Sequence, residues 1–181
     1  MKTTNRFPAV MKTAAALLAA VTAVLIGIYL HTESNAILAA AISCGTTCYH
    51  FTMRLLVGHL IPPVNGTARW FRPRKWEAPF YHFLRVKSWK KHLPTYEPRQ
   101  FSLQEYTPEQ VVRNMCGAEV VHEVIMVCSF LPLLMVPLFG QFVVFFVTSL
   151  LSALLDSLFV MAQRYNRPRL EKILRKQFRI T

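Results

Sequence analysis

The stretch QFVVFFVTSLLSALLDSLFVMA, residues 141–162, decides the fold. It carries a single charged residue, Asp156, and it is long enough to cross the hydrocarbon core of a bilayer, which takes about 20 residues in a helix. We therefore expect it to be a transmembrane helix. Three comparable apolar stretches precede it, at about residues 13–30, 35–61 and 120–138.

Composition and charge agree with a membrane protein. Of the 181 residues 53% are hydrophobic, yet the formal net charge is +12. The basic residues gather before the first stretch, in the segment 62–119 and in the tail 163–181, whereas the two short loops on the other side contain none. Since basic loops stay in the cytoplasm, both termini are expected there. The sequence thus predicts an all-α membrane protein with four transmembrane helices in one integral domain, residues 1–181.

The first apolar stretch has a second interpretation as a signal peptide, because Lys2, Arg6 and Lys12 form a basic start. Its apolar run is longer than the roughly 7–15 residues of a usual signal-peptide core. We expect the helix to be retained. The four cysteines lie mostly in apolar stretches without zinc-site spacing, which favours reduced, buried thiols.

Aromatic and basic residues alternate in the segment 62–119, which favours a loop lying at the membrane interface. A sharper reading is that Lys87, Trp89 and Lys90 bind phosphates of a soluble co-substrate. Proteins that bind single-stranded nucleic acid use the same residue types, but beside four membrane spans we expect no nucleic-acid partner.

Ionisable residues inside the apolar stretches are the candidates for function. A charge in hydrocarbon costs about 2.5–3.5 kcal/mol even on insertion scales, so it usually has a role. Arg54, Glu119, His122, Glu123 and Asp156 are all expected at a similar depth in the inner leaflet. One interpretation is a structural ion-pair cluster, in which Arg54 pairs with Asp156 or Glu123. The other is a catalytic site.

His122 is the side chain best suited to proton transfer near neutral pH. Glu119 lies one turn earlier on the same face, so the spacing favours Glu119 as the carboxylate that orients the ring, with Glu123 as the alternative. Arg54 and Asp156 are expected to shape the pocket. Glu-x-x-His also occurs in di-iron bundles, but these need several such ligands, so no metal is expected.

Three segments occur in an order typical of one family: KSWKKHLP at 87–94, CGAEVVH at 116–122 and QRYNRPRL at 163–170. Together they resemble the glycosyl-4,4'-diaponeurosporenoate acyltransferase family of bacterial membrane enzymes. The resemblance implies that the sugar hydroxyl of a carotenoid-like glycolipid is esterified with a fatty acyl group. An activated donor such as acyl-CoA would be the co-substrate, without a further cofactor, and the acceptor would lie in the bacterial cell membrane.

Arg164, Asn166 and Arg167 follow the last apolar stretch. They are expected to bind a phosphate or sugar headgroup, since arginine matches phosphate in a bidentate way.

The alternative to an enzyme is a non-enzymatic membrane component for assembly or transport of a lipid-linked substrate. Transporters usually contain repeats, and no repeat is evident here, which favours the enzyme.

Overall fold

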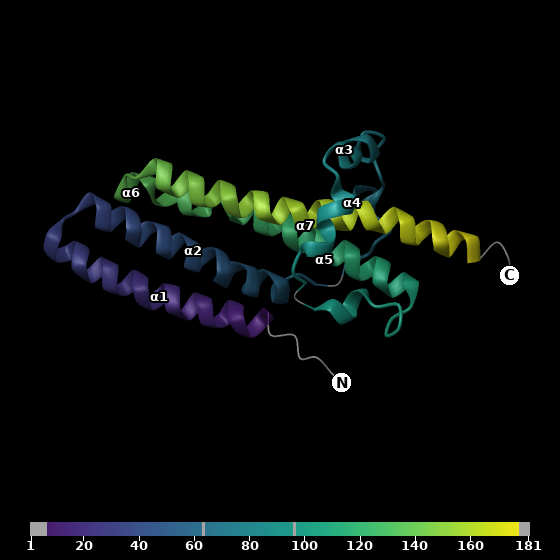
Figure 1. Ribbon diagram of the computed structural model, residues 1–181, viewed down its shortest axis with the longest axis horizontal. Helices are drawn as coiled ribbons and strands as arrows, with labels where there is room; N and C mark the ends of the chain where they lie inside the picture. Colours follow the sequence, from purple (N-terminus) through teal and green to yellow (C-terminus); the bar gives the residue numbers. More distant parts are fainter. Residues whose placement is uncertain (1–6, 63, 96, 178–181) are drawn as a thin grey trace. The chain divides into compact units, whose positions relative to one another are not determined.

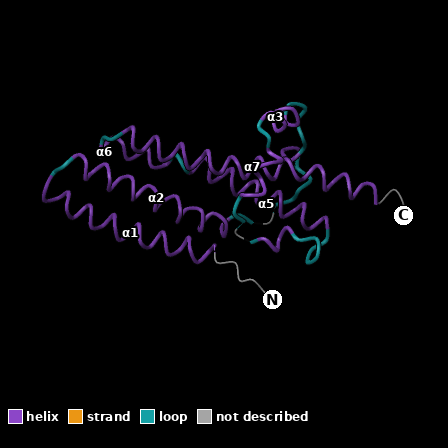
Figure 2. The backbone as a smooth tube through the Cα atoms, viewed as in Figure 1, coloured by secondary structure: helices purple, strands orange, loops and turns teal. Residues whose placement is uncertain are grey.

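The computed structural model describes residues 7–62, 64–95 and 97–177. All regular secondary structure in these ranges is helical (Figure 2). Four segments are long and apolar enough to cross a membrane, namely Phe7–Thr32, Asn35–Leu60, Pro108–Phe139 and Phe142–Leu174. The prediction of an all-α protein with four membrane-spanning helices is confirmed.

Contacts within the chain group its residues into two compact units. The first unit joins the N-terminal segment through Leu60 to Val124–Leu155. The second joins Ile61–Glu123 to the segment that begins at Asp156. The long helices α5 (Pro108–Cys128) and α7 (Phe142–Gln177) each contribute residues to both units.

In the first unit, α1 (Phe7–Thr32) and α2 (Asn35–Leu60) form an antiparallel helical hairpin (Figure 1). Glu33 has a φ of 50°, so the backbone turns sharply between the two helices. The helices approach closely at Gly45, where an added Cβ would lie 3.3 Å from Cγ2 of Thr22. A small residue at this position lets the two backbones pack together.

The C-terminal end of the third apolar stretch is not a continuous α-helix. After α5 ends, the chain continues as a 3-10 helix, η4 (Leu131–Met135), and a short helix, α6 (Val136–Phe139). Pro132 lies in the first turn of η4, and Pro137 lies in the first turn of α6. Backbone N–H groups in a first turn have no partner within the helix, so a proline there costs no hydrogen bond. The two prolines therefore coincide with the end of the regular α-helix and its replacement by a 3-10 helix.

The second unit is built from short helices packed on α5 and α7. These are η1 (Arg69–Phe71), α3 (Glu77–Phe83), α4 (Val86–Trp89), η2 (Lys90–His92) and η3 (Pro98–Phe101). Arg85 precedes α4 with a φ of 51°, which allows the chain to change direction between α3 and α4.

Helix α3 is amphipathic, and Phe80 and Phe83 lie on its exposed face, as does Trp76 just before it. Trp76 and Phe80 are exposed, and Phe83 is 80% exposed. The opposite face buries Glu77 and Tyr81. Burial raises the pKa of Tyr81 to about 12, and the nearby Glu77 carboxylate acts in the same direction, so the phenol stays protonated at neutral pH.

Two helices extend beyond the apolar stretches that predict them. The fourth was expected to end near residue 162, but α7 continues to Gln177. The third was expected to begin near residue 120, but α5 begins at Pro108. Thr107 and Gln110 form a capping box there: Thr107 N–H donates to Gln110 Oε1 at 2.9 Å, and Gln110 N–H donates to Thr107 Oγ1 at 3.3 Å. His122 therefore lies well inside a helix.

The capping box gives the first testable prediction. We expect Thr107→Ala to lower the free energy of unfolding by about 1 kcal/mol, because the backbone N–H of Gln110 loses its acceptor. Thermal unfolding of the purified protein would measure it. Thr107→Ser keeps the hydroxyl and is the matched control. Equal stability of the alanine and serine variants would contradict the assignment.

Candidate functional site

His122 and Asp156 form a hydrogen-bonded pair between α5 and α7 within the second unit. Nδ1 of His122 lies 2.8 Å from Oδ1 of Asp156. The carboxylate is fully buried, while the imidazole keeps 22% of its side-chain surface exposed. The Asp156 carboxylate is thus shielded from water, whereas part of the His122 ring remains accessible.

Phe159 fixes the plane of the imidazole. It lies one turn after Asp156 on α7, and its ring stacks on that of His122 at a centroid distance of 4.5 Å and an angle of 8°. An ionised carboxylate only accepts hydrogen bonds, so the proton of a neutral imidazole belongs on Nδ1. That leaves the Nε2 lone pair to accept a proton, which is the arrangement of a general base held by a carboxylate.

The spacing on α5 favoured Glu119 as the partner of His122, but in the structure Glu119 binds other residues. Its buried carboxylate lies 2.8 Å from Nε of Arg164 and also binds Nη1 of Arg167. Glu119 thus forms ion pairs with two arginines of α7, and Arg167 also donates a hydrogen bond to it. A charge-assisted hydrogen bond is about twice as strong as a neutral one, so these partners outcompete a histidine one turn away. Asp156 takes the orienting position instead.

The two arginines are the centre of a larger ion-pair network. Nη1 of Arg164 lies 2.7 Å from Oε1 of Glu77, and Nη2 lies 3.5 Å from Oε1 of Glu123. Arg167 also donates to the carbonyl oxygen of Phe71. The network therefore fastens the segment containing η1 and α3 onto the two long helices.

Glu123 faces a different group from the one expected. Its Oε2 accepts a hydrogen bond of 2.8 Å from the indole Nε1 of Trp70, while Oε1 faces Arg164. It is thus part of the network rather than an alternative orienter of His122.

Arg164 and Arg167 do not form the headgroup site that the sequence predicts. Arg164 is buried, and Arg167 is only 1% exposed. Both guanidinium groups donate hydrogen bonds to protein carboxylates and carbonyls, so a headgroup would have to displace these partners. In the structure these side chains hold the unit together.

Asn166, by contrast, belongs to a separate basic cluster. Its Oδ1 accepts a hydrogen bond from Nζ of Lys90, which also lies 4.7 Å from the centroid of the Tyr165 ring. Lys87 lies on α4, where its side chain is exposed. The Nε1 of Trp89 donates to the carbonyl oxygen of Leu84, so this indole supports the local turn.

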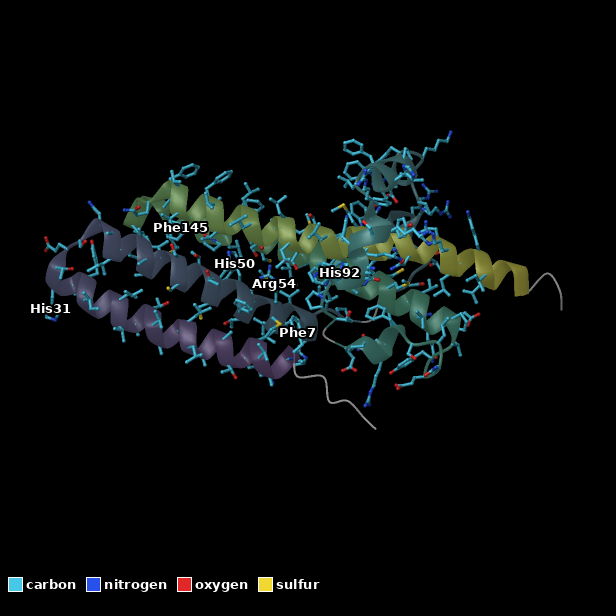
Figure 3. The ribbon with its side chains drawn as sticks, in the orientation of Figure 1. Phe7, His31, His50, Arg54, His92 and Phe145 are labelled. Carbon is cyan, nitrogen blue, oxygen red and sulfur yellow. The ribbon has the colours of Figure 1, made fainter. Side chains whose placement is uncertain are left out.

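Arg54 lies in the first unit, on α2 one turn after His50 (Figure 3). Its Nη2 donates to Oγ of Ser152 at 2.8 Å, and its Nη1 donates to the carbonyl oxygen of His50 at 3.1 Å. Ser152 in turn lies 3.0 Å from Oγ of Ser129. Arg54 thus takes part in a polar network among the apolar helices.

Sequence reasoning missed several residues of the site. Glu77 carries a signal that could have revealed it, because it is the only acidic residue among the cations between residues 69 and 91. Phe159 follows Asp156 at a spacing of three, which places an aromatic ring on the same helical face. Phe71 and Trp70 contribute backbone carbonyls, and no sequence pattern predicts such contacts.

A metal site was not expected, and the residues that could have formed one have other partners. Glu119 of the Glu-x-x-His sequence faces two arginines, and His122 faces Asp156. Within residues 7–62, 64–95 and 97–177, no three His, Cys, Asp or Glu side chains are grouped so as to hold a metal ion.

Comparison with known proteins supplies the class of reaction. The family model of glycosyl-4,4'-diaponeurosporenoate acyltransferase matches residues 67–176, which is more than half of the chain. The chain belongs to this family. No curated protein and no solved structure matches it. The match with the acyltransferase family confirms the resemblance, and it includes the His122–Asp156 pair and the ion-pair network.

Proposed function

We propose that this protein esterifies a sugar hydroxyl of a glycosylated, carotenoid-like lipid with a fatty acyl group from a soluble activated donor such as acyl-CoA. The observation that carries the proposal is the pairing of a partly exposed His122 with buried Asp156. Membership of an acyltransferase family supports the reaction class.

In the proposed reaction, Nε2 of His122 takes the proton of the acceptor hydroxyl as its oxygen attacks the carbonyl carbon of the thioester. The tetrahedral intermediate then collapses and the C–S bond breaks. The departing sulfur takes the proton from Nε2, which yields an ester and a free thiol and restores the neutral imidazole. Asp156 stabilises the imidazolium that forms between these steps.

The proposed setting is a bacterial cell membrane with both termini in the cytoplasm. The positive-inside rule supports this orientation, because the basic segments all lie on one side of the four spans. The exposed aromatic side chains of α3 are of the kind that sits at headgroup level, beside the cations Arg72, Arg74 and Lys75. A soluble donor would then approach from the cytoplasm and the lipid acceptor from the inner leaflet.

Cysteine labelling tests the orientation. A cysteine placed at exposed Gln100 should react with an impermeant thiol reagent only after the cytoplasmic face becomes accessible. A cysteine at exposed Glu33, in the turn between α1 and α2, should react from outside intact cells and serves as the matched control. Labelling of Gln100→Cys in intact cells would overturn the proposed topology.

The proposed activity is tested by deleting the gene and comparing extracted lipids. We expect an acylated glycolipid to disappear and its unacylated form to accumulate, with recovery when the chain is restored. An unchanged lipid and pigment profile would instead favour a non-enzymatic membrane component.

A further inference from the structure

A second cluster of charged residues lies in the second unit, apart from the ion-pair network. It consists of Lys87, Lys90 and Arg169, with Tyr165 and Asn166 between them. The buried network pairs its arginines with carboxylates. In contrast, among the described residues no carboxylate forms an ion pair with any of these three cations.

Tyr165 holds two of the cations in place. The guanidinium of Arg169 lies 3.5 Å from the ring centroid, and Nζ of Lys90 lies 4.7 Å from it. Nη1 of Arg169 donates to the carbonyl oxygen of Tyr165 at 3.1 Å, and Lys90 donates to Asn166. Two like charges are thus kept together by contacts with one aromatic residue and its neighbour.

Lys90 forms no ion pair with a carboxylate among residues 7–62, 64–95 and 97–177. Burial lowers the pKa of Lys90, and the nearby charges of Arg169 and Lys87 lower it further. An anion bound between these groups would relieve the repulsion and favour the charged lysine. The cluster is therefore complementary to an anion.

We propose that Lys90 and Arg169, with Asn166 and Lys87 beside them, bind a phosphate group. Arginine offers a planar pair of donors that matches two phosphate oxygens, lysine adds a compact positive charge, and the Asn166 amide offers a further polar group. Within the part of the chain that the structure describes, no acidic side chain forms an ion pair with these cations and would compete with the anion. This assignment moves phosphate recognition from the buried Arg164 and Arg167 to the partly exposed Lys90 and Arg169.

The phosphate has two possible sources. One is the nucleotide end of a CoA-type donor, in which case the inference rests on the proposed function. The other is the headgroup of an anionic membrane lipid. The shared chemistry is a phosphate ester, and the two sources differ in whether the ligand is soluble.

Direct binding to the purified full-length protein tests the proposal without requiring turnover. The probes are coenzyme A, pantetheine, which lacks phosphate, and short-chain phosphatidylglycerol. We expect Lys90→Gln and Arg169→Gln each to raise the Kd of a phosphate-bearing probe on the order of tenfold, as loss of one charge-assisted contact implies. Pantetheine should bind all variants alike. Arg169→Lys keeps the charge and should recover part of the affinity.

Lys172→Gln is the matched control, since it removes an exposed cation from the same helix outside the cluster. Weakened binding of coenzyme A supports the donor as source, and weakened binding of phosphatidylglycerol alone supports the lipid. Unchanged Kd values for both probes, or an equal loss in Lys172→Gln, would overturn the phosphate site. His122→Ala should bind coenzyme A normally, so failure of the proposed catalysis is separable from failure of this site.

Discussion

Replacing His122 with alanine is expected to lower the rate of acyl transfer by about 10²–10⁴-fold, the usual contribution of a positioned general base. A sugar hydroxyl is a weak nucleophile until its proton is removed, and Nε2 of His122, the ring nitrogen that does not face Asp156, is suited to accept it. The measurement is the initial rate of ester formation by the purified protein with saturating donor and acceptor. Because the ring is partly exposed, the fold should persist.

His122→Gln provides the matched control for the loss of packing on Phe159, because it fills much of the same space but cannot accept and return a proton in the same way. We expect both variants to lose acyl-transfer rate to a similar extent, to accumulate in the membrane and to unfold at similar temperatures. A glutamine variant with the wild-type rate would show that no proton passes through His122.

The second large effect concerns stability. Arg167 is fully enclosed and binds the buried carboxylate of Glu119, so Arg167→Met leaves that carboxylate with a single cationic partner. Removing one partner of a buried ion pair costs about 3–5 kcal/mol. For a chain of this size, we expect the unfolding temperature in detergent to fall on the order of 10 °C.

Lys172→Met is the matched control for Arg167→Met, because it removes an exposed cation from the same helix. Its stability should change by less than about 0.5 kcal/mol. If Arg167→Met were as stable as Lys172→Met, the network would not hold the second unit together, and a binding role for Arg167 would regain support.

The apolar stretches predicted the presence of the membrane helices because length and hydrophobicity alone determine whether a helix can span a bilayer. The helix ends were harder to predict. The third apolar stretch begins only at about residue 120, yet α5 starts at Pro108, because a local capping box begins the helix. The sequence Thr107-Pro-Glu-Gln110 contains the capping-box pattern, so this helix start could have been predicted from the sequence.

The site was predicted only in part. His122 and Asp156 were both selected as intramembrane ionisable residues, but their pairing was not foreseen. Spacing along a helix reveals neighbours on that helix, such as Glu119, whereas Asp156 reaches His122 from another helix. The same limit explains why Arg164 and Arg167 were read as ligand-binding. Their carboxylate partners Glu77 and Glu119 come from distant segments, and the sequence does not show that these segments meet.

The central claim is that Asp156 acts through His122, and a double-variant cycle measures this directly. Asp156→Asn should lower the rate of ester formation strongly, because it no longer stabilises the imidazolium or holds the Nδ1–H tautomer. In the His122→Ala background the same substitution should change the residual rate little, since groups that act as a unit are not additive. If the two losses instead multiply, Asp156 and His122 act independently, and the proposed catalytic pair is wrong.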